Sequence, residues 1–401
     1  MKKILLIAVI GLCGSVARGQ WVQVNNGLSL LYIRALAISG TNIYAGTDGR
    51  GMFLSNNNGN SWSSISVGIT DTIVSSIAIS GTNIFAGTDN ANASGGSVFL
   101  SSNNGSSWVA ANTGLPNSTV NSLIISGTNV FAGTRFYGVF LSSNNGGNWT
   151  AVNTGLPANL EVLSFAISGT NIFVGTFGHG VFLSTNNGSN WSAVSTGLTN
   201  LNVWSLAISG TNIFAGTNGG VFLSANNGSN WSSVNTGIPT NIFGVGALAV
   251  NGTNIFAGTY NGGVFLSTNN GNNWVSVNTM YEPNDIYTMI NSGTNIFVGT
   301  EGGVGVWRRP LSELTGISES ESESNLTISP NPFISQTTIS FSSEQKNSTL
   351  YIRDVLGKEM RKEIFSGKQF IIEKGDLSKG IYFVQITDEN KNIINKKIVV
   401  Q

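Results

Sequence analysis

Seven carboxylates lie in the first three quarters of the chain, and their type and number could support hydrolytic chemistry. Two carboxyl groups at a suitable separation can cleave a glycosidic bond, one acting as the acid and the other as the base or nucleophile. The seven residues are Asp48, Asp71, Asp89, Glu161, Glu282, Asp285 and Glu301. Hydrolysis of a glycoside is therefore one interpretation, to be weighed against where the fold places these side chains.

The sequence offers few residues for other kinds of catalysis or for metal binding. The chain has 1 His and 1 Cys, too few for a His/Cys zinc site, a disulfide framework or a convincing Ser-His-Asp set. The histidine, His179, lies in a Gly-rich stretch that is typical of an exposed turn. We therefore assign no catalytic residue, no metal ligand and no cofactor from the sequence.

Two sets of positions vary while the sequence around them repeats. The first set stands six residues before a recurring glycine and comprises Arg34, Ser75, Asn121, Leu163, Trp204, Gly246 and Tyr287. The second set directly follows a recurring Gly-Thr pair and comprises Asp48, Asp89, Arg135, Phe177, Asn218, Tyr260 and Glu301. Aromatic and charged side chains of this kind stack on sugars or anchor proteins. The candidate ligand-binding residues are Arg34, Asp48, Arg135, Phe177, Trp204, Tyr260, Tyr287 and Glu301. The alternative is that these residues are solvent-exposed loop tips whose aromatic side chains bind no ligand.

Composition limits the possible partners. The 401 residues include 19 basic and 19 acidic side chains, and only 9% of residues are charged. A net charge of zero argues against broad electrostatic binding to nucleic acid or to an anionic membrane. The hydrophobic content of 40% is ordinary for a packed protein.

The chain up to Pro310 consists of repeats. Ser39-Gly40-Thr41-Asn42-Ile43 recurs with small changes, and its glycine returns at Gly81, Gly127, Gly169, Gly210, Gly252 and Gly293. The spacing averages about 42 residues, within the range of propellers, solenoids and arrays. Each unit reads as four short strands separated by Gly, Asn and Thr turns, such as Val203–Ser209, Asn212–Gly216, Gly220–Ser224 and Asn230–Asn235. This pattern predicts a seven-bladed β-propeller, with a β-solenoid as the alternative.

The two ends of the repeat region complement each other. Units one to six contain an S-x-N-x-G-x-x-W box, and unit seven stops without one at Val304–Arg309. Trp21–Leu28 matches the segment that follows the other boxes. We expect this N-terminal strand to complete the seventh blade, which closes the ring and removes exposed strand edges.

Each box predicts a hairpin between the third and fourth strands. Its Asn-Gly pair supplies the positive φ of the turn, and the third-position side chain accepts backbone N–H bonds. The boxes, from Ser55–Trp62 to Ser267–Trp274, resemble those of the Asp-box (BNR) propellers, which include sialidases, sortilin-type receptors and photosystem assembly factors. In this sequence Asn replaces the usual Asp in every copy, which makes calcium at these turns unexpected. The six such positions are Asn57, Asn103, Asn144, Asn186, Asn226 and Asn269.

Strand alternation sorts the loops into two faces. The boxes and the turns between the first and second strands share one face. The turns between the second and third strands and the crossovers between blades share the other, called here the variable face. All the candidate ligand-binding residues belong to it. Arg34, Arg50 and Arg135 could form a sialidase-like arginine cluster there, but the Arg-Ile-Pro signature is absent and sialidases have six blades.

The first residues predict export. Lys2 and Lys3 precede the apolar run Ile4–Cys13 and the small-residue site Ala17-Arg18-Gly19, as in a secretory signal peptide. We expect cleavage near Gln20. The run is too short to span a bilayer, so no transmembrane helix is expected in the mature chain.

The last residues form a second domain. Ser318–Asn325 is a polar Ser/Glu linker, and strand-like segments follow it at Thr337–Phe341, Thr349–Asp354, Phe370–Glu373, Ile381–Thr387 and Ile393–Val400. A small β-sandwich accommodates them. This tail resembles the type A C-terminal sorting domain of the type IX (Por) secretion system at Ser329–Phe333, Tyr351–Lys358, Leu377–Phe383 and Lys396–Val400. The resemblance implies that Pro330, Asn331, Pro332, Gly357, Gly380, Tyr382, Lys396 and Lys397 carry the sorting signal.

The sequence therefore predicts an all-β protein with a seven-bladed propeller and a β-sandwich tail. The expected parts are a signal peptide (1–19), the propeller (20–311), a linker (312–325) and the sorting domain (326–401). The resemblance implies passage through the periplasm, use of the type IX machinery to cross the outer membrane, and a location on the cell surface or outside the cell. The expected function is binding of an extracellular glycan or protein on the variable face, and the alternative is a glycoside hydrolase, sialidase-like or other, that uses the carboxylates there.

Overall fold

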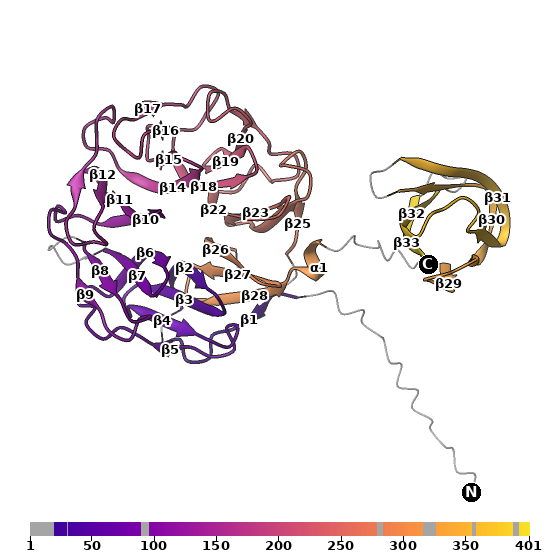
Figure 1. The fold of residues 1–401 in the computed structure, drawn as a ribbon, viewed down its shortest axis with the longest axis horizontal. Helices are drawn as coiled ribbons and strands as arrows, with labels where there is room; N and C mark the ends of the chain where they lie inside the picture. The colour runs from indigo at the N-terminus through magenta and orange to yellow at the C-terminus, as the bar shows by residue number, and fades with distance from the viewer. Residues whose placement is uncertain are drawn as a thin grey trace, which may run out of the picture. The chain divides into compact units, whose positions relative to one another are not determined.

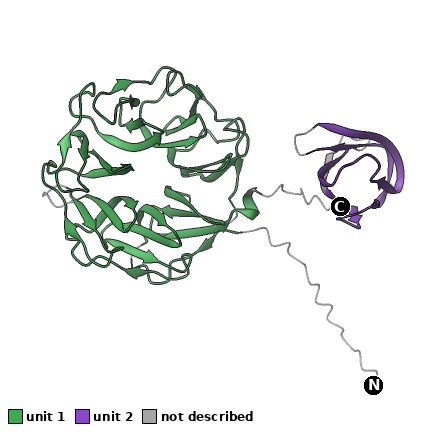
Figure 2. Ribbon diagram, in the orientation of Figure 1, with its two compact units in different colours: residues 1–314 green, residues 315–401 purple. Residues whose placement is uncertain are grey.

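The computed structural model describes residues 20–29, 31–89, 96–278, 284–315, 326–354, 358–387 and 393–401. It contains two compact units, residues 1–314 and residues 315–401 (Figure 2). The expected signal peptide, residues 1–19, lies outside the described residues, as do residues 316–325 of the expected linker.

The first unit is a ring of seven four-stranded antiparallel sheets, as the sequence predicts for a propeller (Figure 1). The innermost strands are β2 (Ile33–Ser39), β6 (Ile73–Ser80), β10 (Val120–Ser126), β14 (Val162–Ser168), β18 (Val203–Ser209), β22 (Gly244–Asn251) and β26 (Ile286–Ser292). The second strands are β3 (Asn42–Thr47), β7 (Asn83–Asp89), β11 (Asn129–Thr134), β15 (Asn171–Thr176), β19 (Asn212–Thr217), β23 (Asn254–Tyr260) and β27 (Asn295–Thr300). Neighbouring innermost strands contact each other around the whole ring, from β2 to β26 and back to β2.

The third and fourth strands form the outside of the ring. The third strands are β4 (Met52–Ser55), β8 (Val98–Ser101), β12 (Gly138–Ser142), β16 (Val181–Ser184), β20 (Gly220–Ser224), β24 (Gly263–Ser267) and β28 (Val306–Pro310). The fourth strands are β5 (Ser63–Ser64), β9 (Val109–Ala110), β13 (Thr150–Ala151), β17 (Ser192–Ala193), β21 (Ser232–Ser233), β25 (Val275–Ser276) and β1 (Val22–Gln23). The core lies between blades, where apolar residues of adjacent sheets pack together, as in the cluster of Phe173, Val181, Val203, Ile213 and Trp231.

The N-terminal strand closes the ring, as expected. In β1, Val22 pairs with Arg308 and Gln23 pairs with Trp307, so the seventh sheet has the order β1-β28-β27-β26. The first blade therefore begins only after the chain has supplied the last strand of the seventh. No blade of the described ring is left with three strands.

A tryptophan joins each blade to the preceding one. The indole Nε1 of Trp231 donates to Val194 O of the preceding blade at 2.7 Å, and the backbone N–H of Trp231 donates to Thr196 O at 2.8 Å. The indole Nε1 of Trp21 makes the corresponding bond for the seventh blade, to Val277 O at 3.1 Å. A Cβ on Gly197 would lie 2.2 Å from Trp231 O, so glycine is required where the chain passes this residue. The other indole donors are Trp62, Trp108, Trp149, Trp191 and Trp274.

The box hairpins have the predicted geometry. Asn57 Oδ1 accepts the backbone N–H of Ser61 at 2.9 Å, and Ser55 Oγ accepts that of Gly59 at 2.9 Å. Asn58 and Gly59 both have positive φ, 61° and 82°. Asn thus suffices as the acceptor that the turn requires, without a charge.

Two expectations about the propeller need correction. The fourth strands are shorter than predicted: β21 covers Ser232–Ser233 instead of Asn230–Asn235, because the backbone of Trp231 bonds to the preceding blade and not to its own. The unit also extends beyond residue 311. Ser312–Thr315 form a short helix, α1, and Leu314 is buried with Leu311 beside Trp21. The linker was predicted to begin at Ser312 because Ser and Glu dominate there.

The second unit is a curled five-stranded sheet. Its strands are β29 (Leu326–Ser329), β30 (Gln336–Arg353), β31 (Glu359–Glu373), β32 (Gly380–Thr387) and β33 (Ile393–Val400), in the order β29-β30-β32-β33 with β31 paired to β30. The sequence predicts a small β-sandwich here, with Thr337–Phe341 and Thr349–Asp354 as separate strands. These two segments belong to one continuous strand, β30, whose first part pairs with β29 and whose last part pairs with β32. Both parts enclose one core, because Ile339 and Ile352 belong to the same buried cluster.

We predict that Trp21→Ala destabilises the propeller as strongly as the same change within the ring. Trp21 is buried and bonded to the sixth blade, and truncation of a buried Trp costs about 3–5 kcal/mol. Chemical denaturation should give similar losses for Trp21→Ala and Trp191→Ala. Val22→Ala, at an exposed position of the same strand, is the control. A loss for Trp21→Ala no larger than that of the control would contradict closure by β1.

Candidate functional site

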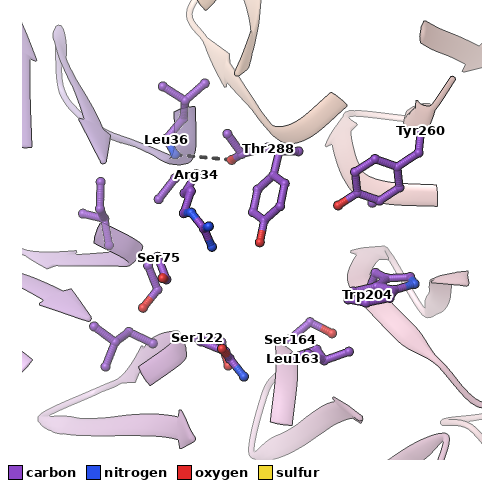
Figure 3. Close-up of a pocket in the computed structure, with 16 residues that line it drawn as sticks. Arg34, Leu36, Ser75, Ser122, Leu163, Ser164, Trp204, Tyr260 and Thr288 are labelled. Atoms are coloured by element: carbon purple, nitrogen blue, oxygen red, sulfur yellow. Dashed lines mark hydrogen bonds between the residues drawn. The ribbon is translucent and has the colours of Figure 1, made fainter. Parts of the chain in front are cut away.

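A cavity of about 290 Å³ lies among the innermost strands of all seven blades. All seven members of the first variable set are among the residues that line it: Arg34, Ser75, Asn121, Leu163, Trp204, Gly246 and Tyr287. Figure 3 shows labelled side chains from separate blades directed toward a common centre. We call this the central cavity.

A β-bulge places each of these seven residues. In every innermost strand the register with the second strand shifts across one residue; in β18, for example, it shifts between Val203 and Ser205. The residue passed over is Trp204, and in the other blades it is the corresponding member of the set. A bulged residue makes no ladder pair and its side chain is re-aimed. The strand ladder therefore places no demand on which side chain stands there.

The second variable set is divided by the fold. Of its members, Tyr260 alone lines the central cavity. It does so because the bulge position of its blade is Gly246, and a Cβ there would lie 2.8 Å from the Tyr260 ring. Asp48 and Glu301 border a smaller hollow beside Arg34 and Tyr287. Arg135 and Phe177 are exposed on the variable face, outside the cavity.

Arg34 and two tyrosines form one connected group. Arg34 Nη2 lies 2.9 Å from Asp48 Oδ2, and its guanidinium stands 5.9 Å from the centre of the Tyr287 ring. Tyr287 and Tyr260 meet edge to face with centroids 6.4 Å apart. Burial opposes the charge on Arg34, but the hydrogen bond to Asp48 and the nearby negative groups raise its pKa above the ordinary value. Burial raises the pKa of Tyr260 and of Tyr287, so both phenols stay neutral.

Trp204 is held in place from two sides. Its ring meets Phe177 edge to face at 6.1 Å, and its Nε1 donates to Asn218 Oδ1. The indole is half-buried at the rim of the cavity. An aromatic surface that is fixed before binding loses little side-chain entropy when a ligand stacks on it.

The remaining wall is uncharged and mixes polar side chains, such as Ser75 and Asn121, with apolar ones, such as Leu36 and Ile77. Asn121 Nδ2 donates to Glu161 Oε1 at 3.3 Å, and Glu161 also pairs with Arg135 at 3.8 Å. The side chain of Glu161 itself lies outside the cavity, and among the described lining residues there is no Asp or Glu. His179 is exposed in the turn between β15 and β16. The described residues contain no group of three or more His, Cys, Asp or Glu placed to hold a metal.

Sequence reasoning missed further aromatic residues of the variable face. Phe136, Tyr137 and Phe243 are exposed, with Phe243 at 73%. The first two directly follow Arg135 of the second set, which is the signal that could have found them. Phe243 precedes β22 in a crossover whose length differs from those of other blades, so alignment of the repeats gives it no counterpart.

In the second unit the end of the chain is fixed on both sides. β33 pairs with β32 along its length. On its other side, Asn331 Oδ1 accepts the backbone N–H of Val399 at 2.8 Å, and Phe333 N donates to Val399 O at 2.9 Å. Pro330 and Pro332 flank Asn331, and both follow cis peptide bonds. Tyr382 is buried, with its hydroxyl 3.0 Å from Ser378 O. Gly380, Lys396 and Lys397 lie in β32 and β33, and Gly357 lies outside the described residues.

Comparison with known proteins identifies the second unit. Residues 327–401 match the family described as secretion system C-terminal sorting domain. An endo-acting ulvan lyase of Formosa agariphila is 34% identical over 98 residues, which are 24% of this chain and 19% of that protein. Within the described residues no helix is long and apolar enough to cross a membrane. The sorting domain directs the chain through the type IX secretion system to the cell surface or the extracellular space.

Solved structures share the fold of the propeller. PorZ, a bacterial surface component of the type IX secretion system of Porphyromonas gingivalis, is 14% identical with a TM-score of 0.58, over 94% of this chain and 60% of that one. A GH74 xyloglucanase of Xanthomonas campestris is 15% identical with a TM-score of 0.61, over 80% of this chain and 59% of that one. YCF48, solved with a D1 peptide, is 12% identical with a TM-score of 0.58, over 75% of this chain and 97% of that one. The chain thus spans about a fifth of the lyase and about 60% of PorZ and the xyloglucanase, and at these identities the structures indicate fold alone.

We predict that the folded protein loses stability as the pH rises above 10. Below the ordinary tyrosine pKa of 10.0, Tyr260 and Tyr287 are protonated in both the folded and the unfolded chain. Above it the unfolded chain releases these protons first, because burial raises the pKa of both phenols in the fold, and unfolding is therefore favoured. Denaturant unfolding at increasing pH should show this loss, and Tyr260→Phe with Tyr287→Phe should reduce its slope. Parallel curves for the two proteins would contradict the assignment.

Proposed function

We propose that the propeller is a binding module, at the cell surface or outside the cell, for an extracellular glycan or protein. One observation carries the proposal: the central cavity is lined by seven bulged residues, one from each blade, and no two of them are the same. The ladder does not constrain these side chains, so their diversity has to be explained by something other than the fold. A ligand that contacts all seven blades supplies that explanation.

The distribution of exposed aromatics supports the same surface. In the described propeller, the aromatic side chains classed as exposed all lie in the turns and crossovers of the variable face. They are Tyr32, Phe136, Tyr137, Phe177 and Phe243. Gathered exposed apolar groups mark interaction surfaces. Receptors as well as enzymes occur among the Asp-box propellers that the boxes resemble, which is compatible with binding.

Binding without turnover is favoured over a glycoside hydrolase. Hydrolysis by carboxylates requires two of them to face one bond, and the described wall of the central cavity supplies none. Asp48 is paired with Arg34, and Glu161 with Arg135. Release of reducing sugars from a glycan panel would reverse this preference.

We predict that Trp204→Ala and Tyr287→Ala each weaken binding about fivefold, since a stacked aromatic contributes on the order of 1 kcal/mol. Both side chains are half-buried at the cavity wall, so thermal stability should change little. A glycan array and a surface-protein panel, followed by titration calorimetry of the hits, measure the effect. If both variants lose several kcal/mol of stability and bind normally, the two residues belong to the core and the site is wrong.

The sorting signal is a second part of the proposal. A signal peptide over residues 1–19 would take the chain to the periplasm, and the type IX machinery would read residues 326–401 there. Pro330, Asn331 and Pro332 would hold β33 at its end, and Gly380 and Tyr382 would maintain the sheet. Lys396 and Lys397 would belong to the terminal strand that the machinery reads, and Gly357, outside the described residues, stays part of the expected signal. Cleavage in the linker would then release the propeller.

We predict that a chain lacking Lys396–Gln401 accumulates in the periplasm. The deletion removes Val399 and Val400, which pair with β32 and with the loop that contains Asn331. Cell fractionation measures the location, and a Thr240→Ala chain with an intact tail is the control. Mass spectrometry of the exported control should find an end after Thr315, because Leu311 and Leu314 are packed in the propeller. Normal export of the deleted chain would remove these residues from the signal.

A further inference from the structure

A long uncharged stretch coincides with one sector of the variable face. Between Glu161 and Glu282 the sequence contains no Asp, Glu, Lys or Arg. These residues supply the loops of the fourth, fifth and sixth blades. Of the described carboxylates between residues 20 and 311, Asp48, Asp71, Asp89 and Glu301 belong to other blades, and Glu161 and Asp285 lie at the two edges of this sector; Glu282 lies outside the described residues. The variable face is therefore divided into a charged part and a neutral part, and the neutral part is formed by the fourth, fifth and sixth blades.

A second hollow opens in the neutral part. It has a volume of about 160 Å³, and its wall includes Asn218, Asn235, Pro239, Thr240 and Ile242. We call it the side hollow. Asn235 forms a rigid wall, because its Oδ1 accepts Val221 N at 2.7 Å and its Nδ2 donates to Gly219 O at 2.9 Å. Phe243, next to Ile242 in the chain, is exposed at the same crossover.

One hydrogen bond joins the side hollow to the central cavity. Trp204 lines the central cavity, Asn218 lines the side hollow, and the Trp204 indole donates to the Asn218 amide oxygen. This bond uses Oδ1 of Asn218, so the donor of this amide that it leaves for a ligand is Nδ2. On its other contact the indole meets the ring of Phe177 edge to face.

We propose that this path holds an uncharged glycan chain, and the inference rests on the proposed function. One end of the chain occupies the central cavity, which at about 290 Å³ is at the small end of ligand pockets. The next sugar stacks on Trp204, and the following units lie in the side hollow beside Phe243. Aromatic faces receive the C–H faces of sugar rings, and the amides and the Thr240 hydroxyl bond their hydroxyl groups.

The charge distribution of the variable face favours a neutral glycan over an acidic one. An acidic glycan needs a cation, and the neutral sector has none: Arg34 and Arg135 are paired with Asp48 and Glu161, and Arg50 is exposed in the first blade, in the charged part of the face. Its negative charges would also meet the carboxylates at both ends of the neutral sector, and like-charge contacts are costly. A protein partner would find no charged group in this sector with which to fix its orientation. A neutral glycan requires none.

The experiment compares chain length and charge. The exported propeller is titrated with neutral gluco-, manno- and xylo-oligosaccharides from monosaccharide to hexasaccharide, and with sulfated and uronate-containing chains of equal length. We expect affinity for the best neutral series to rise with length and the matched anionic chains to bind about tenfold more weakly. Thr240→Trp, which fills the side hollow, and Phe243→Ala should each reduce binding of long chains about fivefold and leave the shortest binder unchanged. Val109→Ala, at an exposed apolar position of β9 outside the variable face, is the control.

The outcomes separate the two proposals. If neutral chains bind but Thr240→Trp and Phe243→Ala leave the length dependence intact, the path is wrong and the binding module stands. If anionic chains bind as tightly as neutral ones, the charge argument is overturned. If no glycan binds and a purified surface protein binds through Trp204, the ligand is a protein and the glycan inference fails. If nothing binds, the proposed function fails with it.

Discussion

The hydrogen bond from each box tryptophan to a carbonyl of the preceding blade is the interaction on which the ring depends. The bond satisfies the indole N–H in the buried seam between sheets, where an unpaired donor would cost about 1–3 kcal/mol. The backbone N–H of each of the six box tryptophans donates a second hydrogen bond to the preceding blade. Trp21 extends the series to the seventh blade, so the contact recurs at all seven seams. These contacts do not involve the bulge residues of the innermost strands, such as Trp204.

The difference between the seam contacts and the bulge positions explains which positions vary from blade to blade. The box hairpins, the Gly residues against the tryptophans and the second strands are nearly the same in each blade, because each has a neighbour that admits no other shape. The bulge residues have no ladder partner, and they range from Gly246 to Trp204. A propeller built in this way can change what it binds while keeping how it folds.

Much of this could be predicted from the sequence. Seven copies of one unit allowed the blades, the closing strand and the two variable sets to be identified, since an error in one copy is corrected by the others. What could not be predicted involves residues brought together from different strands. Tyr260 reaches the cavity only because Gly246 leaves room, and the pairing of Glu161 with both Asn121 and Arg135 crosses two blades. The tail has no internal repeat, so β29 was missed and the continuity of β30 was not recognised.

The order of parts along the chain turns ring closure into a test of completeness. The seventh blade needs β1 from one end of the repeat region and β28 from the other, about 280 residues apart. The sorting domain follows β28. A chain that ends before β28 therefore lacks both the strand with which β1 pairs to close the ring and the sorting domain that directs export. A fragment with an open ring and exposed strand edges would therefore lack the domain that directs export to the cell surface. The order of the domains along the chain thus couples export to a complete propeller.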